Sequence, residues 1–315
     1  KGWEISVSGV PVKVKNFEWK TIFNWSKNNS MVESLPEGID KIQIGSGVYN
    51  VKSYAEVGKP YGAIYAKTFK RDAEGYILCQ LDGSPKEGQD YEYLGCVQAD
   101  WRGGWNNVFR LGNFSFSVMF DFQKGGKFFS QTSIQSSVDG QSVKSLEGRD
   151  ADFFSRKILG ESDEERYGFM RPQNANTPTA NGQIYPDWGR PKGVVLPNCR
   201  YDEDVEGLAG QQVLGYCTPE RYWMHYTSRD ISRFIYDASY VKLREITVSY
   251  DLPKKWLRKT PFQTFRVAAV GRNIATLFAN TPHGLDPQAT STTGNAQGFE
   301  RGFNLPSATY GFDIK

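Results

Sequence analysis

The chain has 315 residues, and 38 Lys and Arg against 35 Asp and Glu give it a net charge of +3 at pH 7. Because these charges are spread along the chain and form no basic stripe, the sequence speaks against nucleic-acid binding. No apolar run approaches the roughly 18 residues that a membrane-spanning helix needs, which excludes helical membrane proteins. From the N-terminus, residues 3–8 and 17–26 instead alternate apolar or aromatic residues with polar ones, which predicts two strands.

The next two predicted strands, 105–111 and 113–122, alternate most clearly. The second places a row of apolar side chains on one face, namely Phe114, Phe116, Val118, Phe120 and Phe122. Such a face is too apolar for water, and aromatic residues at strand ends are typical of the interfacial girdles of outer-membrane barrels. The mean hydropathy of -0.54 by itself suggests a soluble protein, but alternation hides the apolar faces from such an average.

Three more strands are predicted towards the C-terminus, at 240–250, 264–269 and 307–314. The first of these breaks its own alternation, because Val241 and Leu243 share one parity whereas Ile246 and Val248 share the other. Either a β-bulge shifts the phase, or the upper part of the strand stands above the lipid. The sequence leaves both explanations open.

Short and long connections alternate between these seven strands. The short ones lie at 13–16, 111–112 and 252–261, and the long ones at about 28–101, 123–238 and 274–304. Outer-membrane barrels combine short periplasmic turns with longer extracellular loops. The pattern therefore predicts three extracellular loops that carry specificity.

The last 80 or so residues carry motifs whose order resembles one transporter family. They are YVKLRE from Tyr240 to Glu245, VGRN ending at Asn273, LDP ending at Pro287, and Leu305, Pro306 and Ser307 before a final YGF. This region resembles the C-terminal end of SusC/RagA-type TonB-dependent outer-membrane transporters. The resemblance implies an all-β fold, a transmembrane antiparallel β-barrel of about 22 strands in the outer membrane of a Gram-negative bacterium.

Seven strands cannot close such a barrel, so the resemblance implies that this chain is its C-terminal segment. We expect a signal peptide, a TonB box, the plug domain and most of the barrel before Lys1, and a short tail after Lys315. Counting back from a periplasmic C-terminus makes all three long loops extracellular.

The same resemblance implies import of an oligomeric nutrient, an oligosaccharide in the first place. Its partners would be a SusD-like surface lipoprotein that acts as a lid, the TonB complex acting through the plug, and outer-membrane lipid. An oligopeptide importer of the same family is the nearer alternative, and a secreted β-rich glycan-binding module the more distant one. Because the sequence has two His and neither a GxSxG nor an HExxH motif, we expect no catalytic residue and no cofactor.

The four cysteines fall in the predicted loops, Cys79 and Cys96 in the first and Cys199 and Cys217 in the second. Thiols at a cell surface usually oxidise, and four allow three pairings. Loop-local bridges are our hypothesis, because each would close a loop of roughly 15 residues and contribute about 3 kcal/mol. A zinc site fits less well, since there is no CxxC and no His at ligand spacing.

The second long loop contains candidate sugar-binding aromatics. A surface helix is predicted within 148–169, capped by Asp150, and an irregular loop over 171–197. Aromatic rings exposed on such loops stack on sugars, which makes four residues candidates for substrate binding: Trp188, Tyr201, Tyr222 and Trp223. The alternative is that these rings pack against each other and hold the loop together.

Two short motifs in the loops are turns rather than ligand sites. Asp202, Asp204 and Glu206 begin like a calcium loop, but its twelfth position is Val213, where a bidentate Glu is needed. A solvated acidic turn is the better interpretation, and no metal site is predicted. Lys124, Gly125 and Gly126 likewise form a turn, because they have no phosphate-loop context.

Overall fold

The computed structural model describes residues 1–147, 194–217, 219–282, 284–289, 297–302 and 307–315. Its main element is an antiparallel sheet whose seven strands follow each other in chain order. These strands are β1 (Gly2–Val14), β2 (Phe17–Asn28), β8 (Trp101–Leu111), β9 (Phe114–Lys124), β14 (Tyr240–Asp251), β15 (Arg266–Ala279) and β17 (Thr309–Ile314). Each of the seven predicted strands is present.

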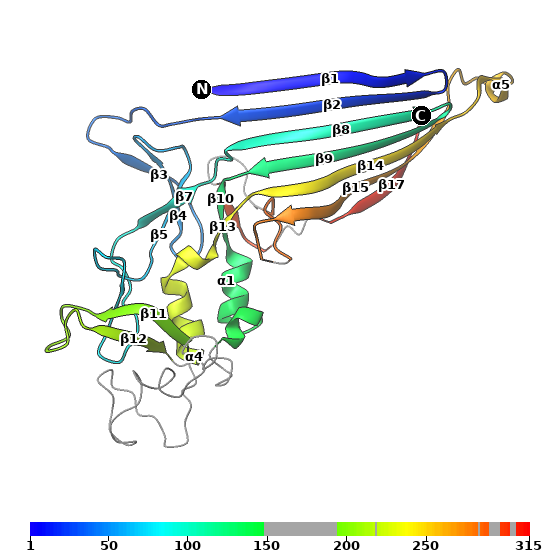
Figure 1. Cartoon of the computed structure of the whole chain (residues 1–315). Coiled ribbons are helices and arrows are strands. Elements are labelled where there is room, and N and C mark those ends of the chain that lie inside the picture. Colours follow the sequence, from blue (N-terminus) through cyan, green and yellow to red (C-terminus); the bar gives the residue numbers. More distant parts are fainter. Residues whose placement is uncertain (148–193, 218, 283, 290–296, 303–306) are drawn as a thin grey trace.

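The connections alternate in length, as predicted. The short ones gather at one end of the sheet, where the one between β14 and β15 carries α5 (Lys254–Leu257). The long ones leave from the opposite end and fold together into a separate body beneath it (Figure 1). Each long connection therefore starts and ends at the same end of the strands.

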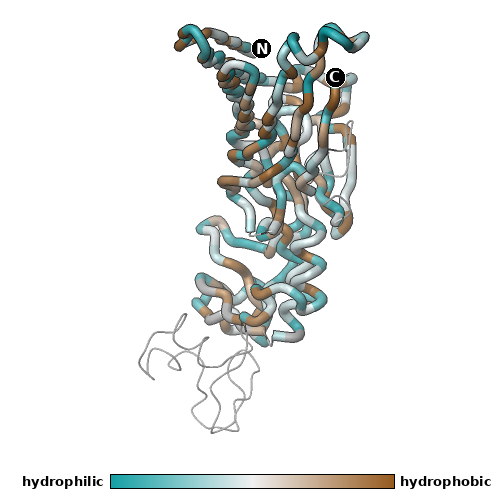
Figure 2. The backbone as a smooth tube through the Cα atoms, turned by 90° about the vertical axis from the view of Figure 1, so that its right-hand side faces the viewer, coloured by the Kyte–Doolittle hydropathy of each residue, from teal (hydrophilic) through white to brown (hydrophobic). Residues whose placement is uncertain are grey.

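Hydrophobic and hydrophilic residues alternate along the strands (Figure 2), so the two faces of the sheet differ in polarity. One face is a layer of apolar and aromatic side chains in cross-strand pairs, such as Val248 opposite Phe116 and Ala269 opposite Phe312. Several of them are exposed, Phe114 by 58% and Phe312 by 86%. The opposite face carries the charged and hydroxyl residues. None of the helices in the described ranges has both the length and the apolar character that a membrane crossing requires.

The break in the alternation of β14 is a β-bulge. Registers with both β9 and β15 jump between Leu243 and Glu245, which leaves Arg244 without an opposite residue on either side. The extra residue restores Ile246 and Val248 to the apolar face. Strand β15 accommodates the same irregularity at Asn273 and continues to Ala279, so the third connection starts later than the sequence predicts.

The long connections contain three small sheets, which the sequence analysis missed. The first comprises β3 (Lys41–Ser46), β4 (Lys52–Glu56), β5 (Ala63–Ala66) and β7 (Glu92–Cys96). The second joins β6 (Ile77–Cys79) to β11 (Val194–Tyr201) and β12 (Gln212–Cys217), and the third joins β10 (Lys127–Ser130) to β13 (Ile235–Asp237) and β16 (Phe299–Glu300). Because the second and third sheets combine strands from different connections, the connections fold as one body.

Short helices complete this body and cover its two cores. They are α1 (Gln131–Val138), η1 (Val143–Leu146), α4 (Pro219–Arg221), η2 (Tyr222–Tyr226), η3 (Thr227–Arg229) and η4 (Ile231–Phe234). Buried residues of all three connections meet in one core, where Ile64, Phe129 and Phe299 are each at most 1% exposed. Glu300 ties the third connection to α1, since its carboxylate accepts hydrogen bonds from Ser130 Oγ at 2.6 Å and Thr132 N at 3.1 Å.

Of the turn predicted at residues 124–126, Lys124 is the last residue of β9, and the two glycines link β9 to β10. Gly125 and Gly126 have φ of 74° and 81°, in the left-handed region that glycine adopts at low cost. They turn the chain from β9 into β10. The helix predicted within 148–169 lies outside the described residues, and of the loop predicted at 171–197 only the end is described, as the start of β11.

Candidate functional site: a polar cluster and a groove on the sheet

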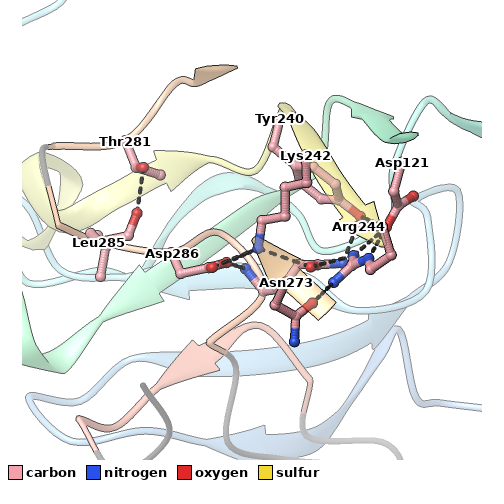
Figure 3. Close-up of polar contacts among 9 residues, drawn as sticks. Asp121, Tyr240, Lys242, Arg244, Asn273, Thr281, Leu285 and Asp286 are labelled. Carbon is pink, nitrogen blue, oxygen red and sulfur yellow. Dashed lines mark hydrogen bonds and ion pairs between the residues drawn. The ribbon is translucent and has the colours of Figure 1, made fainter. Parts of the chain in front are cut away.

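The family motifs meet in space on the polar face of the main sheet. A wall cluster, as we call it, consists of Asp121, Tyr240, Lys242, Arg244, Asn273, Asp286 and Gln288 (Figure 3). It unites residues of YVKLRE, VGRN and LDP, which are separate in the sequence. The cluster lies where the third connection leaves the sheet.

Lys242 and Asp286 form the centre of the wall cluster. The Lys242 Nζ donates to both carboxylate oxygens of Asp286 at 2.5 Å and to Gln288 Oε1 at 2.9 Å. The two ionic side chains are only 5% and 15% exposed. Loss of one partner from such a buried ion pair strongly destabilises the folded protein, because the remaining charge is buried without a counter-ion.

The bulge positions Arg244 in the same cluster. Its guanidinium donates to Asp121, to Gln288 Oε1 at 2.7 Å and to Asn273 Oδ1 at 2.6 Å. Asn273 has φ of 50°, a left-handed conformation that Asn adopts more readily than most residues. Three strands and the third connection are thereby joined through one planar, multi-donor side chain.

Next to the wall cluster, the polar face is hollowed into an open groove of about 630 Å³. It lies over β1, β2, β8 and β9, and its charged residues are Glu4, Arg102 and Asp121. Ser6, Asn24, Ser26, Gly103 and Gly104 also line it, together with the apolar residues Ile5 and Trp25. The groove offers carboxylate, amide and hydroxyl groups to a polar ligand.

Of the aromatic candidates from the sequence, Trp188 lies outside the described residues. Tyr201, Tyr222 and Trp223 are 4%, 1% and 4% exposed, and the last two meet edge to face with ring centroids 5.1 Å apart. The Trp223 indole donates to the Glu147 carbonyl at 3.1 Å. This burial favours the alternative of packing within the loop body over direct contact with sugar.

The four cysteines lie in two parts of the loop body, and the loop-local pair Cys199 and Cys217 shares a core whereas Cys79 and Cys96 do not. Cys79, Cys199 and Cys217 share one core, in which β6 pairs with β11, whereas Cys96 is on β7 of another sheet. A hydrogen bond with Cys199, together with burial, raises the pKa of the Cys79 thiol. Burial also raises the pKa of Cys217 to about 12. The nearest thiols are thus those of different loops.

The acidic turn at Asp202 is neutralised by lysines. Lys70 Nζ donates to Asp202 at 2.9 Å and Lys86 Nζ at 2.8 Å, and Lys86 also pairs with Asp204. Burial acts to raise the pKa of Asp202, but the hydrogen bonds from Lys70 and Lys86 outweigh it and lower the pKa to about 2. The described residues contain no group of three His, Cys, Asp or Glu side chains suited to a metal ion.

Comparison with known proteins agrees with the motifs. No family model matches the chain. The chain is 23% identical, over an alignment of 332 residues, to TonB-dependent receptor P3 of Formosa agariphila, covering 98% of the chain and 27% of the receptor. It thus spans only about a quarter of this relative.

Solved structures have the same fold. The chain aligns over 99% of its length with 28% of a chain of the RagAB peptide transporter, at a TM-score of 0.53 and 13% identity. The 'open-open' state of the RagAB peptide importer gives a TM-score of 0.51 and 15% identity, with the same coverage. The chain is therefore similar to a TonB-dependent receptor, as its motifs indicate, and its fold is similar to part of RagAB.

Proposed function

We propose that the chain forms wall strands and surface loops of a TonB-dependent importer in the outer membrane of a Gram-negative bacterium. The observation that carries this proposal is the seven-stranded sheet, with an exposed apolar face and with all long connections at one end. Outer-membrane barrels have this arrangement, with the apolar face in lipid and the long loops outside the cell.

Closure into a barrel of about 22 strands belongs to the proposal. Strands β1 and β17 each have one neighbour among the described strands. Further strands of a longer protein would pair with their free edges, because an unpaired edge in lipid leaves backbone groups unsatisfied.

The transported substrate is an oligomeric nutrient, for which we favour an oligosaccharide. The hydroxyl, amide and carboxylate groups of the groove, which Ile5 and Trp25 also line, support a ligand that carries hydroxyls. A SusD-like surface lipoprotein would cover the loops, and the TonB complex would act through a plug in the rest of the protein. The wall strands and loops then hold substrate, and no residue performs catalysis.

An oligopeptide is the second candidate substrate. The observation that favours it is the similarity to RagAB, which is named a peptide transporter. Uptake by living cells separates the two, with a labelled oligosaccharide and a labelled peptide of similar mass offered with and without TonB. TonB-dependent uptake of the oligosaccharide supports the favoured substrate. Uptake of the peptide without the oligosaccharide supports the oligopeptide instead.

A secreted glycan-binding module is the third candidate. It requires a protein that stays monodisperse without detergent, which is at odds with an apolar face this large. Sedimentation of the native protein with and without detergent tests this point. A monodisperse protein in plain buffer would contradict the importer.

A further inference from the structure

The small sheet of the first connection carries a second candidate binding surface. One face of β4, β5 and β7 presents the tyrosines Tyr54, Tyr65, Tyr91 and Tyr93, surrounded by the lysines Lys41, Lys52 and Lys59. We call this set the tyrosine–lysine face. It is separate from the groove on the main sheet.

The rings of this face form a continuous row. Tyr54 and Tyr65 meet edge to face with centroids 5.2 Å apart, and Tyr65 and Tyr93 are tilted at 5.7 Å. Strand pairing sets this spacing, since Tyr65 is opposite both Lys52 of β4 and Tyr93 of β7. Tyr65 is 4% exposed and anchors the row, whereas Tyr93 is 42% exposed.

The lysines lie over the rings. Lys41 Nζ is 5.3 Å from the Tyr54 centroid, Lys52 Nζ is 4.2 Å from that of Tyr91, and Lys59 Nζ is 4.6 Å from that of Tyr93. Attraction to the ring faces holds these ammonium groups near the surface. The row is therefore both aromatic and cationic.

Positive charge is in excess on this face. Glu56 is the carboxylate that contacts it, paired with Lys59 at 3.1 Å and bonded to the Tyr65 hydroxyl. Within the described ranges, neither Lys41 nor Lys52 has a carboxylate within salt-bridge distance. Lys41 is opposite Glu56 in the strand pairing, and Lys52 is hydrogen-bonded to Tyr91 and Tyr54. Three ammonium groups thus share one carboxylate, which leaves an excess of positive charge for an external anion.

Folding of the sheet does not need these groups to be cationic. Its opposite face supplies the core, with Val51, Ile64 and Ala66 each 0% exposed. Tyrosines alone, or tyrosines with balanced charges, would cover the outer side equally well. The excess positive charge on this surface-facing aromatic row is therefore not required by the core of the sheet.

We propose that the tyrosine–lysine face binds an anionic oligosaccharide, one that carries carboxylate or sulfate groups. Lys41 and Lys52 donate charge-assisted hydrogen bonds to the anionic groups. The exposed ring of Tyr93 contacts the apolar C–H face of a pyranose, a fit that favours an acidic sugar over an acidic peptide. This inference rests on the proposed function and names the substrate class that the importer selects.

The test uses the whole transporter, purified in detergent from outer membranes. Calorimetry compares an oligogalacturonate with its methyl ester of the same length, in which each carboxylate charge is replaced by a neutral methyl ester. We expect the acid to bind more tightly and to weaken as ionic strength rises. The double substitution Lys41→Gln/Lys52→Gln should weaken binding of the acid by at least about tenfold and leave the ester unchanged.

Two further variants guard against misfolding and bulk charge effects. Lys15→Gln/Lys254→Gln removes the same charge at the opposite end of the main sheet, where both lysines are exposed, and should bind the acid like the parent protein. Tyr93→Leu should weaken acid and ester alike, because the ring contact does not depend on charge.

Equal binding of acid and ester would overturn the inference, as would equal losses in the two double variants or tighter binding of a polyglutamate peptide. These outcomes are distinct from failure of the proposed function. TonB-dependent uptake of a neutral oligosaccharide without preference for the acid leaves the importer in place. Absence of TonB-dependent uptake of any oligomer overturns the importer itself.

Discussion

At the scale of single residues, the Lys242–Asp286 pair is the most consequential contact of the wall cluster. We predict that Lys242→Met destabilises the protein by about 3–5 kcal/mol, because the Asp286 carboxylate, 15% exposed, is left without its counter-ion. Denaturant unfolding of the whole protein in detergent measures the loss. The double substitution Lys242→Met/Asp286→Leu serves as control and should recover much of the stability. A single variant as stable as the parent would contradict a buried ion pair.

Asp202 gives the loop body a defined response to acid. Its folded pKa of about 2 is below the value of about 3.9 for an unfolded chain, so its pairing with Lys70 and Lys86 stabilises the fold above pH 4. This contribution is lost as the pH falls from about 4 to 2. Limited proteolysis across this range should show the loops opening. Asp202→Asn should be less stable at neutral pH and should respond less to acid, and an unchanged acid response would refute this role.

The reactivity of the cysteine thiols shows how the loops are cross-linked. We predict that in the native, non-reduced protein a small alkylating reagent labels Cys96, which is half-buried, well before Cys217, which is 2% exposed and whose pKa burial raises to about 12. Thiolate is the reactive form, and burial raises the pKa of both thiols, so the greater accessibility of Cys96 sets the order. Mass spectrometry of peptides reads out the order. A bridge between Cys96 and Cys79 would abolish labelling of Cys96 and restore the loop-local hypothesis.

The sequence identified the motif segments more readily than what each side chain in them contacts. YVKLRE, VGRN and LDP marked the right segments, but Asp121 joins them only through strand pairing, which a linear pattern does not reveal. The aromatic candidates illustrate the opposite case. Tyr222 and Trp223 resemble exposed loop aromatics in sequence, yet the loops build a core of their own and bury them.

At the scale of elements, the alternation of the main strands has a direct consequence for charge tolerance. We predict that Val248→Arg, on the apolar face and 48% exposed, costs up to about 2–4 kcal/mol, the value for an arginine at the bilayer midplane. Thr247→Arg, one residue away on the polar face, is the matched control and should cost little, since Glu245 contacts that position. Thermal unfolding of the two variants in lipid vesicles measures the difference in their stability. Equal effects would show that the two faces do not differ in environment.

Strands were predictable where one face had to be apolar along its whole length. The strands of the main sheet meet this condition apart from isolated polar residues such as Thr21 and Asn107. The phase break in β14 marked the position of the bulge but left a second explanation open. The strands of the loop body are short, from two to eight residues. Such segments are set by contacts between distant connections, as when β6 pairs with β11, so their local pattern is weak.

At the scale of the whole molecule, two bodies of different character share one chain. The sheet exposes apolar side chains, whereas the loop body buries them in two cores and carries the tyrosine–lysine face. This division fits a protein whose wall lies in lipid and whose loops lie in water. It also explains why composition alone points to a soluble protein.

The measurement that tests this account most directly is extraction of the native protein from cell membranes, followed by intact mass and identification of bound partners. The account predicts an outer-membrane protein that needs detergent, is several times longer than these 315 residues, and copurifies with a surface lipoprotein. A water-soluble protein of about 35.6 kDa without a lipoprotein partner would contradict it.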